Sequence, residues 1–192
     1  MSDPHYFIGL KTEQAADHLL LWQQELREHM QYKVWTNPSD FHVTLKFLGP
    51  ASDEKINKLI TILHQQELPD AFSITIGPAG GFGHPQSPRV FLAEVEKAPQ
   101  LEKLYQQAEK AAAASGWDRE RRKFHPHITL AKKQAEGQSP LSLSNVPPVF
   151  QQKFPMIMDH VTLFRIHPGE HPKYQEVFTI ELKSRDGNGS TN

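Results

Sequence analysis

His42-Val43-Thr44-Leu45 and His127-Ile128-Thr129-Leu130 are two copies of one pattern, His-x-Thr-Leu, in this chain of 192 residues. An extended strand directs residues i and i+2 to the same face. Each copy therefore predicts a strand with an imidazole and a hydroxyl side by side on one face and two apolar side chains on the other. A third copy, His160-Val161-Thr162-Leu163, means that a functional interpretation has to choose among three.

The hydrophobic pattern around these copies predicts a mixture of strands and amphipathic helices. The expected strands cover residues 6–10, 41–48, 72–76, 89–93, the segment around His127, 161–166 and 174–182. The expected helices cover residues 13–30, 52–66 and 99–116, with Ser52 as a capping residue and Pro99 as a first helical residue. Residues 1–183 are expected to form one domain of two lobes, and residues 184–192, which contain no apolar side chain, a disordered tail.

A weak internal duplication distinguishes the three copies. Phe91 follows Phe7 by 84 residues (91 − 7), and His127 follows His42 by 85 (127 − 42). A pseudo-twofold axis would bring the first two copies face to face across a cleft. Subtracting 85 from 160 gives Thr75, which stands in a segment without histidine. We therefore expect His160 to be an ordinary strand residue.

Two histidines and two threonines around one cleft suit acid–base chemistry on a phosphate. Histidine has an unperturbed pKa near 6.5, so one ring can be neutral while the other is protonated. The pair can then act as general base and general acid on opposite sides of one centre. The threonine hydroxyls can donate hydrogen bonds to non-bridging phosphate oxygens. This arrangement fits hydrolysis of a phosphodiester by water in line with a departing ribose hydroxyl, and it requires no metal or other cofactor.

Composition sets only broad limits. With 21 basic and 22 acidic residues, the net charge of −1 argues against charge-driven coating of nucleic acid but permits recognition of a single phosphate. The absence of cysteine from the sequence excludes disulfides and thiolate zinc sites. No stretch approaches the length of a membrane span, and the first residues lack a secretory pattern. We expect a cytoplasmic protein that does not bind membranes and is monomeric.

The sequence resembles the 2H phosphoesterases, and more closely the RNA 2′,3′-cyclic phosphodiesterases once called 2′-5′ RNA ligases. The resemblance covers about residues 5–182. It rests on the two His-x-Thr-Leu motifs and on residues 7–10, Trp35, 41–49, 81–83, 87–90, 122–132, 163–165 and the segment that begins at Tyr174.

This resemblance implies an α+β fold of two pseudo-symmetric lobes, with antiparallel sheets lining a central cleft and helices outside. It implies an active-site quartet of His42, Thr44, His127 and Thr129. In the family the first histidine is assigned as proton donor to the leaving ribose oxygen and the second as the base that activates water, although pseudo-symmetry lets these roles swap. The implied substrates are RNA ends or nucleotides with a 2′,3′-cyclic phosphate, which is opened to a 2′-phosphomonoester.

Further phosphate and substrate contacts are expected around the quartet. Relatives commonly carry arginine where this chain has Lys132, which keeps a positive charge but loses the planar, bidentate fork. Lys132 is therefore interpreted either as a phosphate-binding residue or as a solvated lysine at a strand end. Lys46, Arg122 and Tyr174 are candidate substrate contacts. The basic run 119–123, which contains Arg122, either steers RNA phosphates or is a solvated loop.

Four aromatic residues and two short patterns allow more than one interpretation. Trp35, Phe41, Phe47 and Tyr174 are candidates for stacking on a nucleobase, with core packing the default for Phe41 and Phe47. His125-Pro126-His127 has an alternating-histidine spacing but no nearby carboxylate cluster, so no metal site is expected. The glycines of residues 77–83 do not match a nucleotide-binding loop.

Two rival functions remain at this point. One is a related 2H enzyme that acts on 2′-5′ linkages, on ADP-ribose cyclic phosphate or another ester, or joins RNA ends in reverse. The other is a non-catalytic nucleotide- or RNA-binding module, which intact motifs disfavour.

Overall fold

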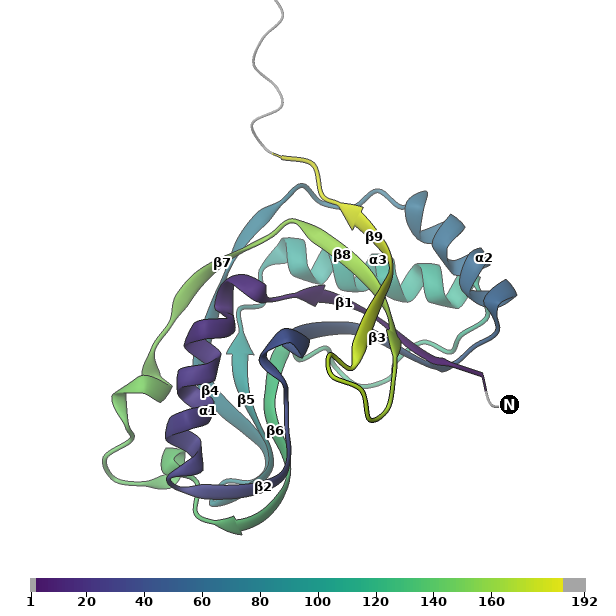
Figure 1. Ribbon diagram of the computed structural model, residues 1–192. Helices are drawn as coiled ribbons and strands as arrows, with labels where there is room; N and C mark the ends of the chain where they lie inside the picture. Colours follow the sequence, from purple (N-terminus) through teal and green to yellow (C-terminus); the bar gives the residue numbers. More distant parts are fainter. Residues whose placement is uncertain (1–2, 185–192) are drawn as a thin grey trace, which may run out of the picture.

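A computed structural model describes residues 3–184 of the chain (Figure 1). The strands are β1 His5–Lys11, β2 Met30–Trp35, β3 His42–Pro50, β4 Phe72–His84, β5 Ser87–Val95, β6 His127–Gly137, β7 Phe154–Met158, β8 His160–Ile166 and β9 Tyr174–Glu181. The helices are α1 Ala16–Arg27, α2 Asp53–His64 and α3 Pro99–Ala114. Short 3₁₀ turns cover Glu13–Ala15, Pro38–Asp40, Pro140–Ser142 and Pro148–Gln151.

The strands form one curved antiparallel sheet that consists of two similar halves. Its order is β7-β4-β5-β6-β3-β1-β8-β9, and β2 adds to β6 beside this path. The halves join where β3 meets β6, and their registered pair there is Val43 with Ile128. Because 43 + 85 = 128, these are equivalent residues of the duplication, so the pseudo-twofold axis passes through this pair. The two sheets expected from the resemblance are thus joined at their inner strands.

The outer strands show the same symmetry. β4 lies beside β5, and β8 lies beside β1 in the matching place of the other half. Thr75 is on β4 and His160 is on β8, in agreement with the offset of 85 that relates them (160 − 85 = 75). The last strands of the two halves, β7 and β9, form the two edges of the sheet.

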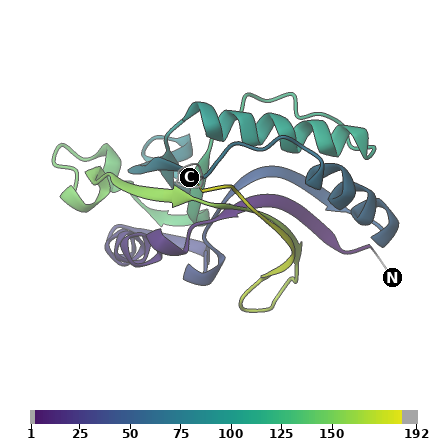
Figure 2. The ribbon, with the colours of Figure 1, turned by 90° about the horizontal axis from the view of Figure 1, so that it is seen from above.

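The helices begin where local chemistry predicts and cover the sheet from outside. Ser52 caps α2, with its hydroxyl accepting a hydrogen bond from the Lys55 N–H at 3.4 Å, and α3 begins at Pro99. Figure 2 shows α2 and α3 next to each other and α1 apart from them. The side-chain amide of Gln23 on α1 donates to the carbonyls of Thr36 and Leu130, both at 2.8 Å, which ties α1 to β6.

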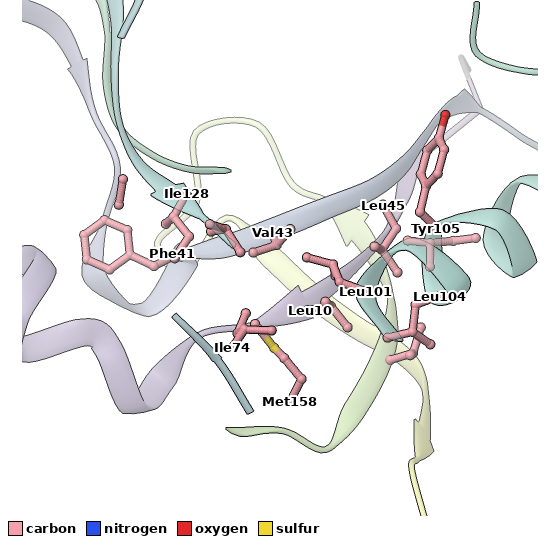
Figure 3. Close-up of a cluster of buried hydrophobic side chains, with 14 of the residues drawn as sticks. Leu10, Phe41, Val43, Leu45, Ile74, Leu101, Leu104, Tyr105, Ile128 and Met158 are labelled. Atoms are coloured by element: carbon pink, nitrogen blue, oxygen red, sulfur yellow. The ribbon is translucent and has the colours of Figure 1, made fainter. Parts of the chain in front are cut away.

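Apolar residues from both halves meet in one continuous core (Figure 3). Val43 and Ile128 are fully buried within it, and Leu101 and Leu104 of α3 pack into the same cluster. The side chains that alternate with the two histidines and threonines therefore anchor β3 and β6 to a common core.

Two strands and one strand extension were missed from the sequence. The first helix, expected to reach residue 30, ends at Arg27, and Met30–Trp35 forms the strand β2, which was not predicted. β7 was not predicted, because its five residues include Pro155, which an edge strand tolerates. β4 continues through the glycine-rich segment to His84. A Cβ atom at Gly80 would lie 2.5 Å from the Glu94 Oε1 atom, so glycine there leaves room for the Glu94 side chain of β5.

Of the predicted disordered tail, residues 185–192 lie outside the described residues. Among the helices within residues 3–184, none is long and apolar enough to cross a membrane.

The residue pair on the pseudo-twofold axis gives a stability prediction. Ile128→Ala is expected to lower the free energy of unfolding by about 2–5 kcal/mol, because it leaves a cavity where the two halves meet. Ile157→Ala is the matched control, since that side chain is 54% exposed on β7 and its loss should cost about 0.5 kcal/mol or less. Urea unfolding followed by circular dichroism measures both. Equal losses would show that the contact between the halves is not a main source of stability.

Candidate active site

A cleft of about 530 Å³ lies on the face of the sheet where β3 and β6 meet. His42 and Thr44 of β3 line it, as do His127 and Thr129 of β6. The structure therefore brings together the four residues that the offset of 85 residues selects. Residues 169–171 and Lys173, from the loop between β8 and β9, line the same cleft.

A β-bulge at the leucine of each motif sets which later residues face the cleft. On β3, Thr44 pairs with Gly9 and Lys46 with Ile8, so Leu45 is the extra residue. On β6, Thr129 pairs with Leu92 and Ala131 with Phe91, so Leu130 is the extra residue. The two bulges are equivalent, since 45 + 85 = 130. After each bulge the alternation of side chains shifts by one residue.

This shift corrects the expectation for Lys46. Simple alternation from His42 and Thr44 would direct Lys46 into the cleft, but the bulge turns it to the buried side. Its ammonium group forms an ion pair with Glu109 at 2.9 Å and donates to the Asp118 carbonyl at 2.7 Å. Lys46 therefore joins β3 to α3 and to the segment that leads to the second motif, and it does not line the cleft.

The same shift directs Phe47 and Lys132, which are equivalent residues (47 + 85 = 132), into the cleft. Phe47 is 60% exposed, so the expectation that it packs in the core is wrong, whereas Phe41 is buried as expected. Lys132 is half-buried between Val34 and Val90 on the neighbouring strands. Burial, together with Lys173 and Lys133, lowers the pKa of Lys132.

A backbone carbonyl two residues earlier in the chain fixes the orientation of the His42 ring. Its Nδ1 atom lies 2.8 Å from the Asp40 carbonyl oxygen, which can only accept, so Nδ1 carries a proton. The Nε2 atom faces the Thr44 hydroxyl at 3.0 Å. The Phe7 and Tyr174 rings pack against the imidazole at centroid distances of 4.6 and 4.9 Å. Nε2 is thus the nitrogen available for chemistry in the cleft.

The ring of His127 is held in the equivalent way. Its Nδ1 atom lies 2.7 Å from the His125 carbonyl oxygen, and 125 − 85 = 40 makes His125 the equivalent of Asp40. The side chain of His125 pairs with Glu94 at 2.6 Å, and Phe82 packs edge-on against His127 at 4.9 Å. Asp40, Phe82 and Glu94 were not singled out from the sequence, because only the folded chain brings them to the motifs.

Both catalytic candidates have lowered pKa values. Burial lowers the pKa of His42 to about 4; the hydrogen bond to Asp40 opposes this effect, and the positive charges of His127 and Lys132 add to it. Burial also lowers the pKa of His127, with the hydrogen bond to the His125 carbonyl and the charge of Glu94 acting in opposition. Both rings therefore favour the neutral form in the free protein, and a bound anion would favour their protonation.

The remaining predicted residues divide between the cleft and the surface. Tyr174 and Trp35 line the cleft. The side chain of Arg122 is 89% exposed, is held by Glu120 at 3.0 Å and lies outside the cleft lining. His160 lies in a separate cavity, where Asp159 holds its Nδ1 atom at 2.7 Å. Within residues 3–184, His, Asp and Glu side chains form no group of three or more that could hold a metal ion.

Comparison with known proteins identifies the family. The family model of the 2′-5′ RNA ligase superfamily matches residues 15–170. This chain belongs to that superfamily. It is 33% identical over 182 residues to the RNA 2′,3′-cyclic phosphodiesterase of Bacillus subtilis (strain 168), covering 93% of this chain and 97% of the relative. It is 26% identical to a protein of the same name from Geobacillus stearothermophilus, of which it covers 58%.

Solved structures confirm the superfamily fold. The crystal structure of E. coli LigT in apo form gives a TM-score of 0.73 at 22% identity and covers 96% of this chain and 100% of that one. The crystal structure of E. coli LigT complexed with 3′-AMP gives 0.73 at 23% identity, with 93% and 98% covered. The expected α+β fold of two pseudo-symmetric lobes is confirmed.

The environments of the histidines in this superfamily member predict distinct titrations. At pH 6 the His42 ring is expected to be neutral, because burial lowers its pKa to about 4. The His160 ring is expected to be protonated at the same pH, because Asp159 raises its pKa. Two-dimensional NMR of the imidazole nitrogens against pH measures both. Titration of His42 above pH 6.5 would contradict the described burial.

Proposed function

We propose that this chain hydrolyses RNA 2′,3′-cyclic phosphodiesters to 2′-phosphomonoesters, with His42 and His127 as a metal-independent acid–base pair. The observation that carries the proposal is the convergence of two equivalent His-Thr pairs on one cleft, each with Nδ1 held by a carbonyl and Nε2 left for chemistry. Relatives named RNA 2′,3′-cyclic phosphodiesterase support the choice of substrate.

The reaction follows from the placement of these groups. The Thr44 and Thr129 hydroxyls and the Lys132 ammonium group bind the non-bridging oxygens of the cyclic phosphate. One neutral imidazole accepts a proton from a water molecule whose oxygen attacks phosphorus. The bond from phosphorus to the ribose 3′-oxygen breaks, and the other imidazole, protonated, donates its proton to that oxygen. The phosphate then remains on the 2′-oxygen.

The walls of the cleft suit a nucleotide at an RNA end. A volume of about 530 Å³ is within the range of small-molecule sites. Phe47 and Tyr174 present aromatic side chains in the cleft, and such side chains commonly stack on unpaired bases. The two lysines that line the cleft, Lys132 and Lys173, would neutralise phosphate charge.

The order of the two histidines is a separate question. The family assignment makes His42 the proton donor and His127 the base. The electrostatics of the free protein favour the opposite order, because His42 has a pKa of about 4 and the charge of Glu94 favours protonation of His127. A bound phosphate changes both values, so we leave the pair unordered and propose a test.

Alanine substitutions test the acid–base pair. His42→Ala and His127→Ala are each expected to slow turnover of a 2′,3′-cyclic phosphate by roughly 10²–10⁴-fold, the usual loss for a general acid or base. His160→Ala is the matched control and should keep the wild-type rate, since His160 lies in another cavity. Chromatography of the products from cyclic nucleotides and from RNA oligomers with cyclic ends measures the rates. A comparable loss in His160→Ala would contradict the choice of motifs.

The same substrate panel separates the proposal from its rivals. Activity should persist in EDTA, because neither histidine needs a metal in this mechanism. Loss of activity in EDTA would contradict the metal-independent mechanism. Binding without any product would favour a binding module, and turnover confined to 2′-5′-linked oligomers would favour the related enzyme.

A sulfur leaving group assigns the two roles. In a cyclic substrate with sulfur in place of the ribose 3′-oxygen, the leaving thiolate needs no proton, so loss of the general acid should matter much less. The variant that lacks the acid is expected to recover most of its rate on this substrate, whereas the variant that lacks the base should stay slow. Recovery by His42→Ala would support the family order, and recovery by His127→Ala the opposite order. Recovery by neither would contradict proton donation to the leaving oxygen.

A further inference from the structure

Asp40 contacts the site through both its backbone and its carboxylate, and the proposed reaction gives the carboxylate no role. It stands at the end of the 3₁₀ turn before β3 and is 5% exposed. Its N–H donates to the Asn37 carbonyl at 2.8 Å, and its own carbonyl accepts from His42 Nδ1 at 2.8 Å. The backbone of Asp40 is therefore fixed between the turn and the catalytic ring.

The carboxylate of Asp40 reaches a different part of the chain. The Lys173 N–H donates to both carboxylate oxygens at 3.0 Å, and the Tyr174 N–H donates to one of them at 3.3 Å. These amides stand where the β8–β9 loop, olive in Figure 1, enters β9. Burying a carboxylate costs free energy unless hydrogen-bond donors satisfy it. The two amides therefore stabilise the buried Asp40 carboxylate, and the carboxylate in turn fixes the position of the loop.

The loop that Asp40 holds carries part of the cleft. The Lys173 carbonyl accepts from the His167 N–H at 2.8 Å, which closes the loop on itself. Lys173 and Tyr174 line the cleft, and the Tyr174 ring packs edge-on against His42 at 4.9 Å. A displacement of these two amides would move both side chains relative to the imidazole.

We propose that Asp40 is a positioning residue, whose carbonyl orients His42 and whose carboxylate fixes Lys173 and Tyr174, so that ring and loop meet the substrate in one geometry. Its kinetic consequences rest on the proposed function, whereas its effect on the His42 ring does not. The equivalent residue in the other half, His125, orients His127 in the same way but binds Glu94 instead of a loop. Asp40 therefore gives the first half a contact that the duplication does not repeat.

The charge of Asp40 is one of several charges that affect the protonation of His42. His127 and Lys132 of β6 and Tyr174 of β9 face His42. A small cavity beside His42 is also lined by Lys11 of β1. Lys11 forms ion pairs with Glu13 and Glu176. The carboxylates that line this cavity or the cleft belong to Asp40, Glu13, Glu176 and Glu170. The charge of Asp40 raises the pKa of His42, whereas the hydrogen bond from the ring is accepted by the Asp40 backbone carbonyl and does not depend on that charge. Removing its charge should therefore disfavour protonated His42 while the other groups stay in place.

Two substitutions separate charge from geometry. Asp40→Asn keeps an oxygen that can accept from the amides but removes the charge, and it is expected to lower the pKa of His42 by roughly 0.5–1 unit with little change in KM. Asp40→Ala removes the acceptor as well, and it is expected to raise KM about tenfold and to lower kcat/KM by about 10–100-fold, the scale of a small misplacement at a reacting centre. NMR titration of the imidazoles and steady-state kinetics across pH measure these effects.

Two controls distinguish positioning from general stability. Leu63→Ala removes a buried side chain of α2 outside the cleft and matches a loss of stability without touching the site. Asp159→Asn removes a carboxylate that lies beside His160 and should leave the kinetics and the His42 titration unchanged. The Asp40 proposal is overturned if Asp40→Asn leaves the His42 titration unchanged, or if Asp40→Ala alters the kinetics no more than Leu63→Ala.

Failure of the proposed function would look different. If the wild-type protein turned over no cyclic phosphate, the proposed reaction would be wrong. The titration of His42 in Asp40→Asn needs no turnover and would still test whether Asp40 acts on the ring. If Asp40→Ala did not fold, the more conservative Asp40→Asn would carry the test alone.

Discussion

The antiparallel pairing of β3 with β6 is the contact on which the rest of this structure depends. Its registered pair, Val43 and Ile128, joins equivalent residues of a duplicated chain, so it places the pseudo-twofold axis between the strands. The residues on either side of this pair in sequence, His42 with Thr44 and His127 with Thr129, are then related by the same axis. Burial of the pair in a common core holds the two motifs in one cleft.

The backbone, rather than long side chains, completes the chemistry of the cleft. In both halves the carbonyl two residues before the histidine fixes Nδ1, which leaves Nε2 for the substrate. In both halves a bulge at the leucine shifts the side-chain alternation and brings a third residue to the cleft. These features repeat because they belong to the duplicated strand and turn, and they need no particular side chain beyond the motif.

The two halves differ in the side chains that stand at equivalent positions of the duplicated backbone. The third cleft residue is the aromatic Phe47 in one half and the cationic Lys132 in the other. The carbonyl that accepts from the ring Nδ1–H belongs to Asp40 in one half, where the Asp40 carboxylate holds a loop, and to His125 in the other, where the His125 ring binds Glu94. In the proposed reaction, water attacks on one side of phosphorus and the ribose oxygen leaves on the other, and such a difference between the halves would favour one assignment of the two histidines.

The sequence by itself determined the two motifs, their separation, most helices and strands, and the exclusion of His160, since these depend on local spacing and on one offset. It also predicted the α+β fold through a family resemblance. Only the tertiary structure decided that Lys46 is buried, that Phe47 is exposed, and that Asp40, Phe82 and Glu94 belong to the site. A bulge is a property of the pairing between two strands, and a loop anchored by a carboxylate about 130 residues away along the chain is a property of the whole fold. Neither leaves a periodic signal in the sequence.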